Sequence, residues 1–401
     1  MVEPQRIAIM GATGSIGRSA LDVIAQANAA ADGAPRFEVT VLASRRDVDG
    51  LAALARLHRP ELTVIAEASL GGALSEALDG TGLDSASGRE AVVEAASRPC
   101  DKLLAAISGS AGLASTLAAV RAGTTVALAN KESIVCAGAL LLDTAQRCGA
   151  TVLPVDSEHN AIFQVWQDGR SVERLTITAS GGPFRTASQE AMARATPAEA
   201  RAHPNWDMGL KNSIDSATLM NKALEFIEAS YLFGLEADAI DVLVHPQSIV
   251  HGMVHYVDGS VLAQLGMPDM RTPIAHTLAW PERIATGVPR LDLAQMGHLD
   301  FGPVDSARFP AVDYARAASR MGNGAATLLN SANEVAVEAY VAGKCGFLDI
   351  SWVVGEMLDR YPGSDLAAVG CKSLDDIAYL DSRAREIASQ LLAKARFRAG
   401  D

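Results

Sequence analysis

Two carboxylates, Asp156 and Glu158, stand one residue apart after an apolar run that ends at Val155. In a strand, residues i and i+2 point to the same side, so we expect both acids to face one point. Neighbouring carboxylates repel each other unless a cation or a shared proton lies between them. Mg²⁺ and Mn²⁺ prefer oxygen ligands of this kind. The pair is a candidate metal site, and a solvated loop after a strand is the alternative that this stretch leaves open.

A third carboxylate lies in residues 214–228, where the apolar spacing predicts one helix. Its polar positions fall on a narrow stripe formed by Ser216, Asn221, Lys222 and Glu225. A surface helix would carry more charge, so we expect this stripe to face an internal polar site, where Glu225 can join the other two acids. The alternative is a single intrahelical pair between Lys222 and Glu225, worth about 0.2–0.5 kcal/mol.

A glycine-rich turn, Gly11–Gly17, follows a predicted buried strand at 6–10 and precedes a helical pattern. This context is typical of a dinucleotide site, because glycine lets the backbone approach a pyrophosphate at a helix N-terminus. The spacing is GxxGxxG instead of the commoner GxGxxG, and glycines also serve plain turns. Further strands are predicted at 37–43, 62–66, 102–107, 125–129 and 151–155, separated by helical stretches. The alternation predicts a parallel, doubly wound sheet, which favours the dinucleotide site.

The second predicted strand ends at Ser44-Arg45-Arg46, where an acid would bind the ribose of NAD. Two arginines favour the 2′-phosphate of NADP(H), although Asp47 follows them and solvated arginines opening a helix are the alternative. The strand at 125–129 leads into Asn130-Lys131-Glu132-Ser133. Ligands bind at such carboxyl ends of parallel strands, so Lys131 can hydrogen-bond substrate or cofactor oxygens. Asn130 and Ser133 can also cap the next helix, which is compatible with that role.

Ser180-Gly181-Gly182 can present a hydroxyl and backbone N–H groups to an anion, or can form a simple turn. The stretch from 180 to about 210 is a long loop, predicted to act as a lid that carries His203 and Trp206. Residues 248–257 and 260–265 read as a hairpin turning at Asp258-Gly259. His251 and His255 share one face of that hairpin, and ordinary packed residues are favoured over ligands there.

Net charge and cysteine content limit the kinds of partner and the compartment that we expect. A formal net charge of −13 argues against nucleic acid, but a few local cations can still hold a small anionic substrate. Five scattered cysteines without a CxxC pair indicate a reducing compartment, and neither a signal peptide nor a membrane-spanning run is evident. A cytoplasmic protein without a membrane partner is expected.

The predicted organisation has three parts joined by a linker. We expect a Rossmann-like NADPH-binding domain at 1–156, a central α+β domain for metal and substrate at 157–290, and a linker at 291–320. Amphipathic helices at 321–342, 346–360 and 373–397 then predict a C-terminal helical bundle at 321–401.

The motifs in this order resemble the 1-deoxy-D-xylulose 5-phosphate reductoisomerase family. The matching pieces are Gly11–Gly17, Leu128–Ser133 (LANKES), Leu153–Gln164 (LPVDSEHNAIFQ), Ser180–Arg185 (SGGPFR), His203–Gly209 (HPNWDMG), Asp215–Glu225 (DSATLMNKALE), His245–His251, Val261–Pro281 and Asn330–Ala336. One departure is the end of the second strand, where family members often carry Gly-Lys-Asn and this chain has Ser44-Arg45-Arg46.

The resemblance implies NADPH- and metal-dependent rearrangement and reduction of 1-deoxy-D-xylulose 5-phosphate, a small phosphorylated sugar, by a homodimer. It implies that Asp156, Glu158 and Glu225 bind Mg²⁺ or Mn²⁺, with Co²⁺ as a further candidate. The implied catalytic residues are Lys131, Asp156, Glu158, Glu225 and His203. The implied substrate contacts are Ser157, Ser180, His203, Trp206, Ser216, Asn221 and Lys222, with Lys131 on the hydroxyls and Met208 beside the lid. The implied cofactor contacts are Thr13, Gly14, Ser15, Ile16, Ser44, Arg45, Arg46, Asn130, Glu132 and Gly209.

Two alternatives stay open. One is a metal-free dehydrogenase of the homoserine-dehydrogenase type, in which Lys131 and Lys222 do the chemistry. The other is a non-catalytic NADP(H)-binding sensor. His159 gains no role from these arguments and is expected to lie outside the site.

Overall fold

The computed structural model describes residues 3–31, 33–202, 206, 209–322 and 324–394. The chain divides into two compact units. The first comprises Met1–Ser133, Leu141–Asn160 and Asp269–Pro289, and the second comprises Ile134–Leu140, Ala161–Pro268 and Arg290–Asp401.

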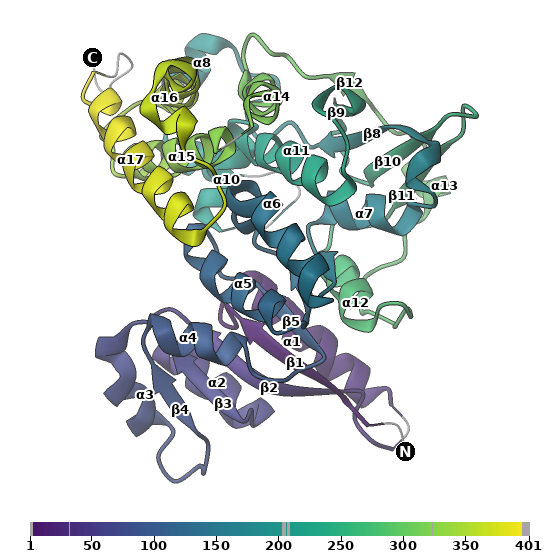
Figure 1. Ribbon diagram of the computed structural model, residues 1–401. Coiled ribbons are helices and arrows are strands. Elements are labelled where there is room, and N and C mark those ends of the chain that lie inside the picture. The colour runs from purple at the N-terminus through teal and green to yellow at the C-terminus, as the bar shows by residue number, and fades with distance from the viewer. Residues whose placement is uncertain (1–2, 32, 203–205, 207–208, 323, 395–401) are drawn as a thin grey trace. The chain divides into compact units, whose positions relative to one another are not determined.

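The first unit is built on a seven-stranded parallel sheet in the order β4-β3-β2-β1-β5-β6-β7 (Figure 1). Its strands are β1 (Gln5–Met10), β2 (Phe37–Ser44), β3 (Leu62–Ile65), β4 (Ser85–Ser87), β5 (Lys102–Ala105), β6 (Thr125–Leu128) and β7 (Val152–Pro154). The strands are short apolar runs because helices cover a parallel sheet and bury both of its faces. The predicted doubly wound sheet is confirmed, and the short strand β4 is an addition that no apolar run announced.

Helices alternate with these strands. They are α1 (Ser15–Ala29), α2 (Val48–His58), α3 (Gly71–Ala77), α4 (Arg89–Ala96), α5 (Leu113–Arg121) and α6 (Lys131–Cys148), whose middle turns belong to the second unit. A helix from much later in the chain, α12 (Arg271–Ala279), adds Ile274 and Leu278 to the same core and packs against α1. Lys102 Nζ on β5 donates to the carbonyls of Thr277, Leu278 and Trp280 at the end of α12, at 3.2, 2.6 and 2.9 Å.

The second unit has a mixed five-stranded sheet in the order β11-β10-β8-β9-β12. Its strands are β8 (Val172–Ala179), β9 (Ile240–Val244), β10 (Val250–Tyr256), β11 (Val261–Leu265) and β12 (Gly302–Pro303). The predicted hairpin at Asp258-Gly259 is confirmed as β10–β11, and Gly259 takes a φ of +86° that favours glycine.

Apart from α13 (Leu293–Met296), which buries none of its residues, the helices of the second unit share one apolar core with this sheet. They are α7 (Ser157–Val165), which begins in the first unit, α8 (Gln189–Ala193), α9 (Pro197–Arg201), α10 (Leu210–Ala217), α11 (Met220–Phe233), α14 (Ala311–Met321), α15 (Ala325–Val341), α16 (Phe347–Arg360) and α17 (Leu374–Leu392). Helices α15, α16 and α17 lie side by side (Figure 1). Leu175 and Ile177 of β8 belong to the same core as Leu328 of α15 and Val353 of α16, so the C-terminal helices and the sheet stabilise each other.

Residues 291–320 were expected to have little regular structure, and that expectation was wrong. Strand β12 pairs antiparallel with β9, and α14 begins at Ala311. A two-residue strand leaves no alternating pattern, and its pairing depends on β9, which lies far away in the sequence. Among the described residues, no helix is both long enough and apolar enough to cross a membrane.

Candidate active site

The first unit places Lys131 and Asp156 in contact. Lys131 opens α6 just after β6, Asp156 follows β7, and Lys131 Nζ lies 2.7 Å from Asp156 Oδ2. Burial alone would raise the pKa of the Asp156 carboxyl, but the Lys131 ammonium group and His159 hold that pKa well below its usual range. These positive charges therefore favour the ionised form of Asp156.

The strand-spacing argument for Asp156 and Glu158 was wrong. Strand β7 ends at Pro154 and helix α7 begins at Ser157, so Glu158 lies in the first turn of a helix. An acid there is favoured by the partial positive charge of the helix N-terminus. Ser157 Oγ donates to Glu158 Oε2 at 2.6 Å. The two acids thus come from a strand-to-helix turn instead of from one face of a strand.

Two residues of this turn were missed or given no role. His159 is fully buried on α7 and is one cause of the lowered pKa of Asp156. Asn160 Nδ2 donates to Pro154 O at 2.8 Å and lies 3.1 Å from His276 Nδ1. Burial lowers the pKa of His276 to about 4, which keeps the ring neutral and able to accept this bond. These contacts hold the turn that carries Asp156. In the sequence, the only indication of them was that the residues lie inside motifs that resemble the family.

Asn130 caps helix α6, as the sequence allowed. Its Oδ1 accepts from Ser133 N at 2.6 Å, and its Nδ2 donates to Ile107 O and, at 2.9 Å, to Gly109 O. Ser133 contributes a backbone N–H and not its hydroxyl to this cap. The cap places Lys131 at the first turn of α6, and Glu132 beside it is buried.

The glycine-rich turn between β1 and α1 is tightly constrained. A Cβ on Gly11, whose φ is +98°, would lie 2.4 Å from Ala106 O, and one on Gly17 would lie 2.4 Å from Gly11 O. Gly14 precedes α1 without a side-chain cap, and Ser15 and Ile16 form the first turn. The N-terminal N–H groups of α1 thus have no side-chain cap, and such a helix start can bind an anion.

The end of β2 lies beside this turn. Ser44 Oγ and Thr13 Oγ1 share a hydrogen bond of 2.8 Å. Arg45 and Arg46 are exposed, and Arg46 Nε lies 3.3 Å from Glu67 Oε2. Among the described residues, Arg45 has no ion pair. Asp47 accepts from Gly50 N at 2.9 Å and so caps α2, which explains the acid at this position without a ribose contact.

The second unit brings Ser180 close to Ser216. Gly181 and Gly182 have φ values of +85° and +65°, and Gly182 N donates to Ser180 Oγ at 3.2 Å. A Cβ on Gly182 would lie 2.6 Å from Ser216 O, so only glycine lets the loop approach α10 this closely.

The predicted helix 214–228 is two helices. Leu219 between α10 and α11 has a φ of +59°, and Thr218 Oγ1 donates to Ile214 O and Asp215 O and accepts from Met220 N. The sequence shows neither glycine nor proline at this break, because the Thr218 side chain satisfies the backbone groups that the break leaves open. Ser216 therefore ends one helix, and the other polar residues of the predicted stripe begin the next.

Lys222 and Glu225 form a buried ion pair. Glu225 is 1% exposed and Lys222 is 4% exposed, and Lys222 Nζ and Asn221 Nδ2 each donate to one carboxylate oxygen of Glu225. The intrahelical ion pair between Lys222 and Glu225, which was the alternative, is present. Because the pair is buried, the small energy expected for a surface salt bridge does not apply to it. Lys222 and Glu225 are buried and Asn221 is half-buried, and the internal polar site that these residues were expected to face stays a prediction.

The lid prediction falls partly outside the described residues, since His203 and Met208 are not among them. The Trp206 ring lies 6.2 Å from the His251 ring in an edge-to-face arrangement, and Gly209 precedes α10. His251 Nε2 lies 3.2 Å from Gly266 O, and His255 Nε2 lies 2.8 Å from Thr176 Oγ1. Both histidines have ordinary packing partners, as favoured from the sequence.

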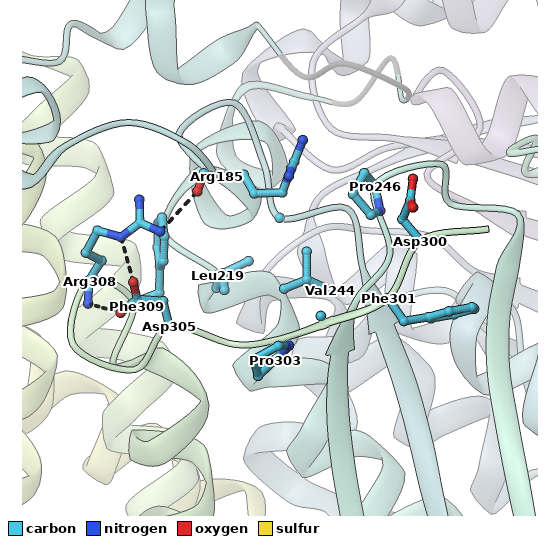
Figure 2. Close-up of a pocket in the computed structure, with 12 residues that line it drawn as sticks. Arg185, Leu219, Val244, Pro246, Asp300, Phe301, Pro303, Asp305, Arg308 and Phe309 are labelled. Carbon is cyan, nitrogen blue, oxygen red and sulfur yellow. Dashed lines mark hydrogen bonds and ion pairs between the residues drawn. The ribbon is translucent and has the colours of Figure 1, made fainter. Parts of the chain in front are cut away.

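A pocket of about 230 Å³ lies behind the Ser180–Arg185 loop. Figure 2 shows it between Arg185, Leu219, Val244 and the segment that carries Arg308. Its walls are largely apolar, with Asp300, Asp305 and two arginines at the margin.

Comparison with known proteins covers nearly the whole chain. Models described as 1-deoxy-D-xylulose 5-phosphate reductoisomerase match residues 7–138, and models of its C-terminal domains match residues 152–233 and 265–387. The enzymes of this name from Rhodospirillum centenum and Caulobacter vibrioides are 53% and 49% identical over 393 and 402 residues. These alignments cover 97% and 100% of this chain and 95% and 99% of the relatives.

Solved structures agree with the sequence comparison. The Zymomonas mobilis enzyme in complex with NADPH superposes with a TM-score of 0.89 at 47% identity, over 97% of this chain and 99% of the other. A reductoisomerase in complex with NADPH, fosmidomycin and magnesium superposes with a TM-score of 0.91 at 44% identity, over 98% of this chain and all of the other. The chain belongs to the 1-deoxy-D-xylulose 5-phosphate reductoisomerase family.

Proposed function

We propose that this chain uses NADPH and a divalent metal ion to convert 1-deoxy-D-xylulose 5-phosphate to 2-C-methyl-D-erythritol 4-phosphate, the reaction of its family. The observation that carries the residue assignment is that each unit holds a proposed metal-binding carboxylate against a lysine. These pairs are Lys131 with Asp156 in the first unit and Lys222 with Glu225 in the second. The positions of all four residues lie inside the matched family regions.

The donor set fits Mg²⁺ or Mn²⁺. We propose Asp156, Glu158 and Glu225 as the ligands, since all three offer carboxylate oxygens and no sulfur. The lowered pKa of Asp156 keeps one ligand ionised without a metal. In solved relatives the metal is magnesium.

NADPH fits the glycine turn of the first unit. The crowded backbone at Gly11 and Gly17, together with the uncapped start of α1, leaves room for a pyrophosphate at Thr13, Gly14, Ser15 and Ile16. Arg45, exposed beside the Ser44 hydroxyl, is our candidate for the 2′-phosphate. Asn130, Glu132 and Gly209 stay proposed cofactor contacts.

The second unit fits the substrate phosphate. Ser180 and Ser216 supply hydroxyl donors from two adjacent segments, and Asn221 and Lys222 supply an amide and a positive charge from the next helix. A phosphate fixed here provides binding energy remote from the reacting carbons. His203 and Trp206 stay proposed lid residues.

We propose that the two lysines change their hydrogen-bond partners when metal and substrate bind. When bound, the metal ion polarises the substrate carbonyl and NADPH supplies a hydride to the rearranged aldehyde. Lys131 and Lys222 no longer need to neutralise their carboxylates and turn their ammonium groups to substrate hydroxyl and phosphate oxygens. Ser157 adds a hydrogen bond to a substrate hydroxyl.

The oligomeric state and the cellular location of the protein are also proposed. We propose a homodimer in the cytoplasm, in line with the reducing environment that five cysteines without CxxC spacing indicate. Sedimentation and cell fractionation test these two points.

The reaction is tested by following NADPH absorbance with 1-deoxy-D-xylulose 5-phosphate and Mg²⁺ or Mn²⁺. We expect oxidation that stops after chelation and returns when metal is added. Turnover that survives thorough chelation would instead support a metal-free dehydrogenase. NADPH binding without any oxidation would support a sensor.

A further inference from the structure

The loop that carries Ser180 has a packing anchor in Phe184, which is buried in the core of the second unit and contacts Phe347 edge to face. On the Ser180 side of Phe184, the loop borders a pocket of about 230 Å³ at Gly181. Both glycines of the loop have positive φ values, and glycine loses more conformational freedom on folding than any other residue. Phe184 therefore fixes the middle of the loop, whereas the two glycines have no side chains with which to pack.

Arg308 adds a second restraint, from a distant part of the chain. It stands just before α14, in the stretch expected to be a linker. Its Nη1 donates to Ala187 O at 2.6 Å and its Nη2 to Arg185 O at 3.1 Å. Figure 2 shows the guanidinium group between Asp305 and the Arg185 carbonyl.

The guanidinium group is itself held in place. Its Nε donates to Asp305 Oδ2 at 2.8 Å, and the group lies 5.3 Å from the centre of the Phe309 ring. The side chain is 26% exposed. A planar fork fixed on one side by a carboxylate and an aromatic ring bridges two carbonyls on the other side with donors whose relative positions are rigid, whereas a lysine in this place would present one flexible group to the carboxylate and both carbonyls.

The C-terminal end of the loop folds back over its N-terminal glycine. The methylenes of Arg185 lie over Gly181, so that a Cβ on Gly181 would come within 2.5 Å of Arg185 Cδ. Holding the carbonyls of Arg185 and Ala187 therefore limits where Gly181, and with it Ser180, can lie.

We propose that Arg308 is a positioning residue for the phosphate-binding loop, which rests on the substrate role proposed above for Ser180. It acts through the carbonyls of Arg185 and Ala187 and does not itself touch the substrate. Because the proposed ligand of Ser180 is the phosphate, which is remote from the reacting carbons, freeing the loop is expected to weaken substrate binding more than the chemical step.

The chain offers a matched control in Arg316 on α14. Arg316 is 28% exposed, donates to two carbonyls, of Ala237 and Ile240, and lies 5.3 Å from the Phe226 ring, but its carbonyl partners lie in the turn before β9 and at the first residue of that strand. Arg308→Met and Arg316→Met remove the same group from equivalent surroundings. Arg308→Lys keeps the charge beside Asp305 and removes the fork.

The test measures KM and kcat for 1-deoxy-D-xylulose 5-phosphate, the inhibition constant of inorganic phosphate, KM for NADPH, and the melting temperature. For Arg308→Met and Arg308→Lys we expect KM for the sugar phosphate to rise about tenfold or more, with kcat less affected. Inhibition by phosphate should weaken in parallel, whereas KM for NADPH should stay unchanged. Arg316→Met should resemble the unaltered protein in all four kinetic values.

The outcomes separate the two proposals. If the unaltered protein shows no oxidation of NADPH with this substrate, the proposed function fails. If it is active and both Arg308 variants keep the KM and phosphate inhibition of Arg316→Met, the positioning role fails. Should Arg308→Met lower the melting temperature, Arg308→Lys at an unchanged melting temperature still decides the question.

Discussion

Replacing Glu225 by Gln is expected to abolish most metal-dependent turnover while leaving NADPH binding nearly unchanged. The substitution keeps the shape of the side chain and removes its charge. Two losses follow, because Glu225 both neutralises the buried Lys222 ammonium group and is a proposed metal ligand. NADPH is spared because its proposed site lies mainly on the first unit.

The two losses have different sizes and different readouts. An ammonium group left buried without its partner costs on the order of 3–5 kcal/mol, so the melting temperature should fall by several degrees. At an effective dielectric constant of about 20, two unit charges about 4 Å apart interact by about 4 kcal/mol. Removing this carboxylate is thus expected to weaken metal affinity by close to a thousandfold, at about 1.4 kcal/mol per tenfold change.

Glu334 on α15 is the matched control for the stability loss. Its carboxylate also accepts from an asparagine four residues earlier, Asn330, and from a cation, Arg385, and it is 13% exposed. Glu334→Gln is expected to lower the melting temperature without changing the metal dependence of turnover. Both variants are assayed by NADPH oxidation over a range of Mg²⁺ concentrations and by thermal unfolding with and without Mg²⁺.

One result would refute this reasoning. If Glu225→Gln loses stability to the same extent as Glu334→Gln but keeps the Mg²⁺ dependence of the unaltered protein, Glu225 is a structural partner of Lys222 and the three-carboxylate site is wrong.

Three further perturbations test other parts of the structure. Arg45→Ala should raise KM for NADPH about tenfold and leave KM for NADH unchanged, since one charge-assisted hydrogen bond to a phosphate is lost; equal effects on both cofactors would remove Arg45 from the 2′-phosphate. Burial lowers the pKa of His276 from 6.5 to about 4, so the stability that depends on the neutral ring is fully present above pH 6.5, and at most about 3 kcal/mol should be lost as the pH falls from 6.5 to 4. His276→Gln should remove that pH dependence in urea unfolding followed by tryptophan fluorescence, and an unaltered profile would contradict it. Lys102→Met leaves three carbonyls at the end of α12 without their donor and should destabilise the first unit by about 3 kcal/mol in the same assay; unchanged unfolding would show that these contacts contribute nothing.

Much of the fold was predictable because short-range sequence patterns determine it. Apolar runs separated by helical stretches predict the parallel sheet, and Asp258-Gly259 predicts the hairpin, since each depends on neighbouring residues alone. The candidate chemistry was also visible, because carboxylates, lysines and glycine-flanked serines are recognisable by type. The resemblance, and not the spacing, assigned their roles.

What remained hidden depends on residues that lie far apart. The break at Leu219 carries no glycine or proline and is stabilised by the Thr218 side chain. The buried setting of Lys222 and Glu225 follows from the packing around α11, and α12 joins the first unit through its apolar residues and through the hydrogen bonds of Lys102.

The segment Asp156-Ser157-Glu158 shows both what the sequence predicts and what it leaves open. The sequence by itself determined that two acids and a hydroxyl stand together after a strand. Only the tertiary structure decided that Ser157 begins a helix, that Lys131 neutralises Asp156, and that the distant Arg308 holds the loop of Ser180. The physical reason is that local propensities select strands, turns and helices, whereas the position and charge of a side chain depend on which distant groups share its burial.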